Sequence, residues 1–384
     1  MTEPRPTFPF DPIRHDQRVR DVISRWRHLC SQVRASSVSP NRAGNVLSAQ
    51  NRPHDRADFA PLPAQTGTGE PVRTLIACSG GADSTALTLI LALACRNSPD
   101  TLVLGHIVHD MREPSLAQQD ADHVHAMGTA LGIPVVTRSI SCKDAGSNAE
   151  SLARARRYDA LHDIAYDHAC PAIATAHHAD DQLETVLMRL FRGSGLKGLS
   201  GIAPIRRLSP DYSIIRPMLG ISRADAVNIC RLCNTDWQHD TTNDDLSRSR
   251  AYIRHTLAPL IHDRFERAAE HVSTAADLVS NTHKLVQSHA DQLYEAAVIE
   301  RSNLHITLDR RRLHESHAIT LGELTRAVIL DLSENIGMDR VTQPVIASLI
   351  DAILSSDGST KTIQTGFVEW TITREHVTAA KSGE

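Results

Sequence analysis

Aromatic residues, long apolar runs and a regular set of cysteines are all lacking in this sequence of 384 residues. Phe, Trp and Tyr make up 4% of it, so Leu, Ile, Val and Ala must fill most of any core. No apolar run approaches the roughly 20 residues of a membrane span, and the start, MTEPRPTFPF, lacks the basic and apolar segments of a signal peptide. The seven cysteines are scattered and odd in number. We therefore expect a cytoplasmic protein with no disulfide framework and no membrane partner.

An excess of positive charge is also absent. The net charge is −4, which does not indicate a general nucleic-acid binder. Any RNA-binding surface must then be a local basic patch on an acidic protein. The length predicts two or three domains.

The first 70 residues differ in composition from the rest. They are rich in Pro, Arg, Ser, Asn and Asp, which predicts a flexible N-terminal extension over 1–70, with a short helix around 15–34 as an option. After it, helical patterns alternate with four runs typical of buried strands: VRTLIACS, TLVLGHIVH, IPVVTRSI and PAIATAHH. This alternation predicts an α/β fold, with a parallel Rossmann-like sheet covered by helices on both faces. Ligands of such sheets bind beyond the carboxyl ends of the strands.

The C-terminal part has a different pattern. Residues 264–298 contain no Pro or Gly and many helix formers, which predicts a long helical linker over 263–299. A small mixed α/β domain is expected over 300–384, with two helices and a hairpin-like end.

The stretch ACSGGADSTAL (77–87) follows the first predicted strand. Its two glycines lack a Cβ and let an anion approach backbone N–H groups, and the next helix directs its positive end to the same place. No Walker A motif occurs in the chain, so the lysine of such loops is missing. A tight turn capped by Ser or Asp is the alternative interpretation. Because hydroxyls and an acid surround the glycines, we favour a phosphate-binding loop formed by Ser79, Gly80, Gly81, Ala82, Asp83 and Ser84.

A second polar group lies in ATAHHADDQLETVLMRLF (174–191). Asp181 and Glu184 are three residues apart at the start of a predicted helix, so both carboxylates share one face and could hold magnesium or an ammonium group. A helix cap explains one acid but not the whole set of polar residues: His177, His178, Asp180, Asp181 and Glu184. Zinc is disfavoured, because adjacent histidines on a strand point to opposite faces and no H-E-x-x-H motif is present. The following GSGLKG comes after a helix rather than a strand, which predicts a mobile loop instead of a dinucleotide site.

These motifs resemble those of a known family. The order S-G-G-x-D-S after a strand resembles the pyrophosphate loop of the N-type ATP pyrophosphatases, the PP-loop family. Residues 174–202 and the segments HIVHDMR, AESLARARRYDAL, IIRPML and WQHDTTNDDLSRSRAYIR resemble its tRNA(Ile)-lysidine synthetase branch. The resemblance covers residues 72–262 and, more weakly, 300–384. The chain departs from the family at Asp110 and Ala251, where the family has Gly and Asn.

The resemblance implies an organisation and an activity. It implies an N-type ATP pyrophosphatase catalytic domain over 71–262 and a tRNA-binding domain over 300–384. ATP would adenylate C2 of the wobble cytidine in the CAU anticodon of tRNA(Ile), releasing pyrophosphate, and free L-lysine would then displace AMP to form lysidine. ATP and Mg²⁺ are the implied cofactors, tRNA(Ile) and lysine the partners, and a homodimer is a candidate assembly.

Together with the resemblance, the residue types suggest roles. Asp83, Asp181, Glu184 and Arg250 are the candidate catalytic residues, with Asp83 and Asp181 as magnesium ligands. The candidate substrate or RNA contacts are His177, Arg192, Lys197, Arg206 and Arg254. For the arginines a solvated helix face is the alternative. The run DRRRLHESH, with Arg310, Arg311 and Arg312, is a weaker candidate for contacts with the acceptor arm.

Three other functions remain open from the sequence. The CRLC segment, with Cys230 and Cys233, would suit a PP-loop tRNA thiolase, although two buried small side chains explain this i, i+3 pair better. A small-molecule ligase would exchange pyrophosphate into ATP without RNA. A non-catalytic nucleotide-binding module would not require the acids at Asp181 and Glu184.

Overall fold

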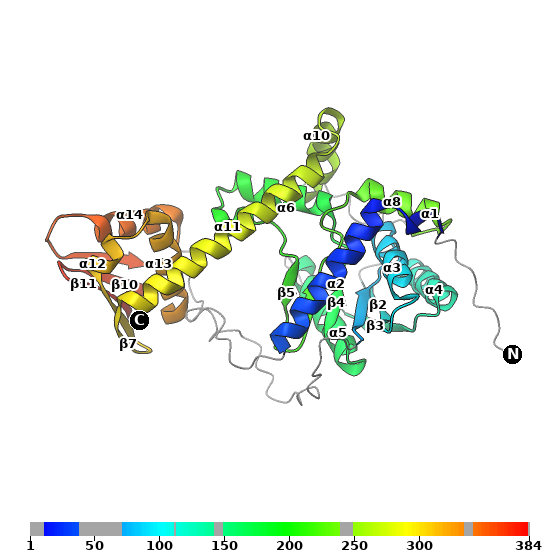
Figure 1. Cartoon of the computed structure of the whole chain (residues 1–384), viewed down its shortest axis with the longest axis horizontal. Helices are drawn as coiled ribbons and strands as arrows, with labels where there is room; N and C mark the ends of the chain where they lie inside the picture. The colour runs from blue at the N-terminus through cyan, green and yellow to red at the C-terminus, as the bar shows by residue number, and fades with distance from the viewer. Residues whose placement is uncertain are drawn as a thin grey trace. The chain divides into compact units, whose positions relative to one another are not determined.

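The computed structural model describes residues 11–37, 71–110, 113–141, 149–238, 249–333 and 341–382. They belong to two compact units, whose boundary falls between Ser280 and Asn281 inside the long helix α11 (Ala268–Ala297) (Figure 1). None of the described helices is long and apolar enough to cross a membrane.

The first unit is built on a six-stranded sheet with the order β3-β2-β1-β4-β6-β5. Its strands are β1 (Arg73–Ala77), β2 (Thr101–His109), β3 (Val135–Ile140), β4 (Ala172–Ala174), β5 (Ile205–Arg207) and β6 (Ser213–Ile215). All neighbours pair in parallel except β5 and β6, which are antiparallel. The predicted parallel α/β fold is therefore confirmed, with one antiparallel edge strand added.

Alternate residues of the central strands face two separate cores, as the two-residue period of a strand requires. On β1, Leu75 lies in one buried cluster and Ile76 in the other. The helices that follow in this unit are α3 (Ala82–Cys95), α4 (Pro114–Leu131), α5 (Ala149–Asp167), α6 (Ala179–Phe191), α7 (Leu196–Leu199), α8 (Arg223–Leu232), α9 (Ser249–Tyr252), the π-helical η2 (Ile253–Leu257) and α10 (Ala258–Arg264). Residues of α3, α4 and α8 belong to the Ile76 cluster and residues of α5 to the Leu75 cluster, so helices cover both faces.

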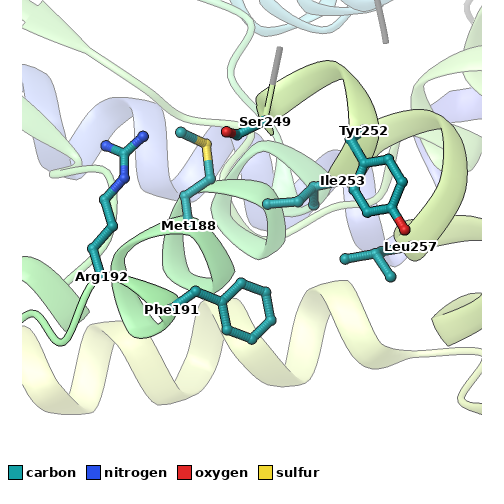
Figure 2. A pocket seen from close by; sticks show the side chains of 7 residues that line it. All are labelled: Met188, Phe191, Arg192, Ser249, Tyr252, Ile253 and Leu257. Atoms are coloured by element: carbon teal, nitrogen blue, oxygen red, sulfur yellow. The ribbon is translucent and has the colours of Figure 1, made fainter. Parts of the chain in front are cut away.

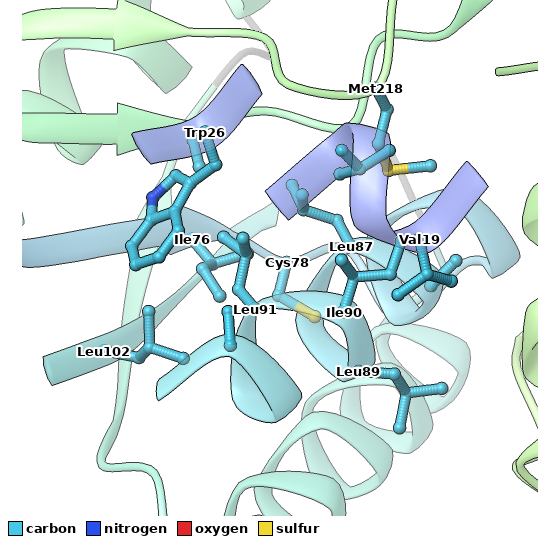
Figure 3. Close-up of a cluster of buried hydrophobic side chains, with 14 of the residues drawn as sticks. Val19, Trp26, Ile76, Cys78, Leu87, Leu89, Ile90, Leu91, Leu102 and Met218 are labelled. Carbon is cyan, nitrogen blue, oxygen red and sulfur yellow. The ribbon is translucent and has the colours of Figure 1, made fainter. Parts of the chain in front are cut away.

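Within the flexible extension expected over 1–70, residues 11–37 are instead helical and partly buried, which confirms the optional helix around 15–34. Residues 11–37 form α1 (Asp11–Arg14) and α2 (Gln17–Ser37). The buried residues of α2 recur every three or four positions and form one apolar face: Val19, Val22, Trp26, Leu29 and Val33. Figure 3 shows Val19 and Trp26 pointing into the cluster that contains Leu87 and Leu91 of α3. This periodicity was the signal that the polar composition of the segment concealed, because composition averages over both faces of a helix.

The second unit holds an antiparallel sheet and helices of its own. The strand order is β7-β8-β11-β10-β9, from β7 (Val298–Arg301), β8 (His305–Asp309), β9 (Lys361–Thr365), β10 (Val368–Ile372) and β11 (His376–Lys381). The helices are α12 (Arg310–His314), α13 (Ala318–Ser333) and α14 (Gln343–Leu354). Their apolar faces and the end of α11 enclose one core around Trp370, which is fully buried. The small α/β fold expected for the C-terminal part of the chain is therefore confirmed.

Arg310 has a structural place in this unit. Its guanidinium is buried and donates to the backbone carbonyls of Ala352, Ile353, Ser355 and Thr373, at the C-terminal end of α14 and beside it. Of the three arginines considered for RNA contacts, Arg310 is thus occupied in the core, while Arg311 and Arg312 are exposed.

The packing of α2 yields a stability prediction. Trp26 is 1% exposed, and its indole N–H donates to Thr74 Oγ1 of β1 at 3.4 Å. Trp26→Ala should lower the free energy of unfolding of the first unit by about 3–5 kcal/mol, because it opens a cavity and removes the indole donor from the Thr74 hydroxyl. Urea denaturation followed by circular dichroism measures the change, with the exposed Arg27→Ala on the same helix as control. Equal stability of the two variants would show that α2 is not part of the core.

Candidate active site

The glycine-rich stretch lies where β1 ends and α3 begins. Gly80 has φ +85°, a conformation that side chains with a Cβ rarely adopt, and Gly81 occupies the N-cap position of α3. No side chain caps this helix. The N–H groups of its first turn therefore point outward without a side-chain acceptor, which is the arrangement that binds phosphate at a helix N-terminus.

Internal hydrogen bonds hold the loop in this shape. Ser84 Oγ accepts from the backbone N–H of Ser79 at 3.2 Å and donates to the Gly81 carbonyl at 3.0 Å. Ser79 Oγ lies 3.2 Å from Ser84 Oγ and accepts from the Gly81 N–H at 3.4 Å. Ser84 is buried and Ser79 is exposed. We infer that Ser84 shapes the loop, whereas Ser79 can also reach a ligand.

Two residues outside the stretch support it. The buried His106 of β2 has Nδ1 2.9 Å from the carbonyl oxygen of Cys78, and burial lowers the pKa of its imidazole. The backbone N–H of Gln238 donates to the Gly80 carbonyl at 2.9 Å. Sequence reasoning did not identify His106, because its supporting role follows from the pairing of β1 with β2.

A carboxylate–arginine cluster lies at the start of α6 and joins residues far apart in the sequence. Arg250 Nε donates to Glu184 Oε2 at 2.9 Å, and Arg254 Nε donates to Glu184 Oε1 at 2.6 Å. Both arginines also contact Asp181 Oδ1, at 3.2 and 3.3 Å. The side chains of Asp181 and Glu184 are 12% and 3% exposed, whereas those of Arg250 and Arg254 are 41% and 31% exposed, so the acids are buried and the arginines remain partly in water. The structure thus brings together the two acids and the two arginines that the sequence singled out separately.

His178 connects this cluster to the glycine-rich loop. Its Nε2 lies 3.5 Å from both Asp83 Oδ2 and Asp181 Oδ2, and its Nδ1 lies 3.5 Å from Asp180 Oδ2. Burial lowers the pKa of the imidazole, but the carboxylates of Asp181, Asp180 and Asp83 outweigh burial and raise the pKa to about 10. A protonated His178 therefore lies between three carboxylates, and the pKa of Asp181 is lowered in turn, against burial, chiefly by His178.

His177 faces a different environment. Burial, together with the positive charges of Arg216, Arg154 and Arg250, lowers the pKa of its imidazole to about 4, and the nearby Asp181 only partly opposes this. Its Nδ1 lies 2.9 Å from Thr175 Oγ1. The sequence proposed His177 as a substrate contact, but His178 is the histidine that faces Asp83. Local pattern gave no means of choosing between two adjacent histidines on opposite faces.

A magnesium ligand needs a carboxylate oxygen that no hydrogen bond occupies, and Asp83 meets this requirement better than Asp181. Its Oδ1 is buried and has no hydrogen-bond partner among the described residues. Asp181 Oδ1 contacts both arginines, and its Oδ2 accepts from the His178 backbone N–H at 3.1 Å. No group of three or more His, Cys, Asp or Glu side chains suited to a metal occurs in the described parts of the chain. Asp83 can thus contribute one oxygen to an ion whose other ligands come from phosphate or water.

Three other residues proposed to contact RNA form no ion pair with this cluster among the described residues. Arg192 at the end of α6 and Lys197 of α7 are exposed, and neither has an ion pair in the described part of the chain. Arg206 of β5 stacks over the ring of Tyr158, 4.5 Å from its centroid. Of the departures from the family pattern, Asp110 accepts from Ser141 Oγ at 2.6 Å. The neighbouring Met111 and Arg112, and residues 239–248, lie outside the described residues.

The two cysteines of CRLC are core residues. Cys230 and Cys233 are 0% and 1% exposed and free. Burial raises the pKa of their thiols to about 12 and about 11. Because metal–sulfur clusters are bound by thiolates, this environment disfavours a cluster at these positions.

Comparisons with known proteins show what the sequence is similar to. A family model described as a PP-loop domain matches residues 60–261. A protein named tRNA(Ile)-lysidine synthase from Rhodopirellula baltica is 32% identical over 260 residues, which cover 63% of this chain and 65% of that protein. Its namesake from Bordetella bronchiseptica is 35% identical over 234 residues, which cover 60% and 63%. The chain therefore spans a little less than two thirds of the length of these relatives.

One solved structure, the U34-tRNA thiolase NcsA from Methanococcus maripaludis with its 4Fe-4S cluster, was also similar. It shares 15% sequence identity with a TM-score of 0.44, covering 54% of this chain and 72% of that one. A likeness of this extent carries no information about function.

The environment of His178 yields a pH prediction. Because its pKa in the folded protein is raised from 6.5 to about 10, its stabilising contribution should be complete below pH 6.5 and lost as the pH rises toward 10. The difference in unfolding free energy between the wild-type protein and His178→Asn should therefore be largest near pH 6 and shrink as the pH approaches 10. Urea unfolding at several pH values measures it. The exposed His125→Asn serves as control, and a difference for His178→Asn that does not change with pH would contradict the charged bridge.

Proposed function

The chain belongs to the PP-loop domain family, and from this premise we propose that it is an ATP-dependent RNA-modifying ligase that forms lysidine in tRNA(Ile). The observation that carries the proposal is the link through His178 between the uncapped start of α3 and the carboxylate–arginine cluster. A simple nucleotide-binding module requires the first of these but not the second. The names of the relatives support the choice of lysine and tRNA(Ile) as substrates.

In the first step the loop binds the β- and γ-phosphates of ATP. The free N–H groups at the start of α3 and the hydroxyl of Ser79 donate to their oxygens, and the positive end of the helix offsets their charge. O2 of the cytidine attacks the α-phosphorus, and the bond to the bridging oxygen breaks, so pyrophosphate leaves. Mg²⁺, when bound, neutralises charge on the departing pyrophosphate, and Asp83 Oδ1 is the oxygen available to hold it.

In the second step the ε-amine of lysine attacks C2 of the adenylated cytidine. A carbon–nitrogen bond forms, the carbon–oxygen bond breaks, and AMP leaves with that oxygen. The ε-ammonium gives up one proton to water before the attack and a second as the bond forms, so the product nitrogen keeps one hydrogen. Four carboxylates and three cationic side chains meet in the site: Asp83, Asp180, Asp181 and Glu184 against His178, Arg250 and Arg254. The net charge of −1 suits an incoming ammonium group. Asp181 and Glu184 are the carboxylates that would orient it, once an arginine gives up one of its contacts.

The competing functions make different use of the same fold. A thiolase would require reactive cysteines, and the buried, protonated thiols of Cys230 and Cys233 disfavour that role. A small-molecule ligase would not require RNA. The tRNA-binding role of the second unit, the bound Mg²⁺ and a homodimer belong to this proposal as further expectations.

The activity can be tested by incorporation of labelled lysine. The protein, incubated with ATP, Mg²⁺ and tRNA(Ile) bearing a CAU anticodon, should transfer label from lysine to the tRNA. Asp83→Asn should lower the rate about 100-fold or more, because it removes the carboxylate charge that would hold Mg²⁺ beside the phosphates. Asp122→Asn, at an exposed carboxylate of α4, is the matched control and should keep the wild-type rate.

The alternatives give distinct results in the same assay. Pyrophosphate exchange into ATP without RNA, and no label in tRNA, would indicate a small-molecule ligase. Transfer of sulfur that is abolished by Cys230→Ala would indicate a thiolase. Either result would overturn the proposed function.

A further inference from the structure

An apolar pocket of about 450 Å³ lies next to the carboxylate–arginine cluster. One wall is the end of α6 and the other is α9 with η2 (Figure 2). The lining residues are Met188, Phe191, Arg192, Ser249, Tyr252, Ile253 and Leu257. Two of them are exposed aromatic residues: Phe191 is 67% and Tyr252 is 48% exposed. Because only 4% of the residues are aromatic, two exposed rings at one pocket indicate that the pocket binds a ligand.

The pocket continues the faces that carry the cluster. Glu184, Met188 and Phe191 follow one another at helical spacing on α6, so the backbone of Phe191 lies two turns, roughly 10 Å along the helix, beyond that of Glu184. On the opposite wall, Ile253 immediately precedes Arg254. A ligand that reaches from the cluster into the pocket thus needs to span about three stacked base steps.

The chemistry of the pocket fits an unpaired nucleobase. Flat rings stack on aromatic side chains, and unpaired RNA bases are recognised mainly in this way. Arg192 offers an exposed guanidinium without an ion pair in the described part of the chain, and none of the seven lining residues is acidic. Figure 2 shows Arg192 and Tyr252 on opposite sides of Met188 and Ile253, so polar groups border an apolar floor. A positive, aromatic surface suits RNA better than a second copy of this acidic chain, whose net charge is −4.

We propose that this pocket binds, by stacking on Phe191 and Tyr252, an unpaired base of the RNA that flanks the reacting cytidine. This inference rests on the proposed function, because it takes the RNA as the molecule that reaches the cluster. The stacked base holds the loop of the RNA open and orients the strand that carries the cytidine toward Asp181 and Glu184. Arg192 binds a phosphate of the same strand.

Binding of a fluorescent anticodon stem-loop RNA with a CAU loop tests the proposal on the full chain. Phe191→Ala and Tyr252→Ala should each weaken binding about tenfold or more, as expected for loss of one stacked base. Phe191→Tyr should bind the RNA as tightly as the wild-type protein. Phe191→Leu, which keeps apolar contact but has no flat ring, should bind it as weakly as Phe191→Ala. Phe265→Ala removes an aromatic residue that is 64% exposed but does not line the pocket, and it should leave binding unchanged.

A second probe separates stacking from a structural role. The unpaired loop bases within three steps of the cytidine are replaced, one at a time, by abasic sites. With one of these probes the wild-type protein should bind as weakly as Phe191→Ala binds the intact RNA, and Phe191→Ala should weaken binding to that probe no further. The stacking role would be overturned if Phe191→Ala weakened binding to every abasic probe as much as it weakens binding to the intact RNA. Equal RNA binding by Phe191→Leu and the wild-type protein would overturn it too. A shift from dimer to monomer on Phe191→Ala, seen by sedimentation, would instead assign the pocket to contact between copies.

The outcome is distinguishable from failure of the proposed function. If the wild-type protein binds ATP, measured by calorimetry, but neither binds this RNA nor transfers lysine to tRNA(Ile), the proposed function fails. If the wild-type protein binds the RNA and transfers lysine, and the pocket variants bind the RNA as tightly as it does, only the stacking role of the pocket fails.

Discussion

Parallel pairing of β1 with β4 is the constraint on which the site depends. The two strands are neighbours in the sheet although about 95 residues separate them in sequence, and both end at the same edge. The helices that follow them, α3 and α6, therefore begin side by side. That adjacency places Asp83 and Asp181 within 3.5 Å of one imidazole, that of His178. The uncapped start of α3 and the acidic start of α6 become a single site by this means.

Compensation of charge explains why so many acids can be buried together. An isolated buried carboxylate would be protonated or destabilising, whereas Asp181 and Glu184 each contact both arginines. His178 extends the network to Asp180 and Asp83. Such a network holds its members in defined positions before a substrate arrives, which favours chemistry that needs aligned groups.

The architecture keeps this network on rigid supports. The helices α3 and α8 share the core beneath the loop, where Cys230 Sγ donates to the Ala82 carbonyl at 3.4 Å. The N-terminal helix α2 completes the same core. The pair of cysteines that resembled a reactive motif thus contributes to the packing that supports the phosphate loop, because in an apolar interior a thiol behaves as a small hydrophobic group.

The sequence by itself determined the elements whose signals are local. The alternation of strands and helices, the loop at 79–84 and the shared face of Asp181 and Glu184 all follow from spacing over a few residues, and the structure contains each of them. It did not show that α2 belongs to the core, that His178 rather than His177 faces Asp83, or that Arg250 and Arg254 bind the acids of α6. Those facts depend on which strands become neighbours and which helix faces meet across 60 or more residues. Only the folded chain decides them, because short-range periodicity contains no information about the partner that an element will meet.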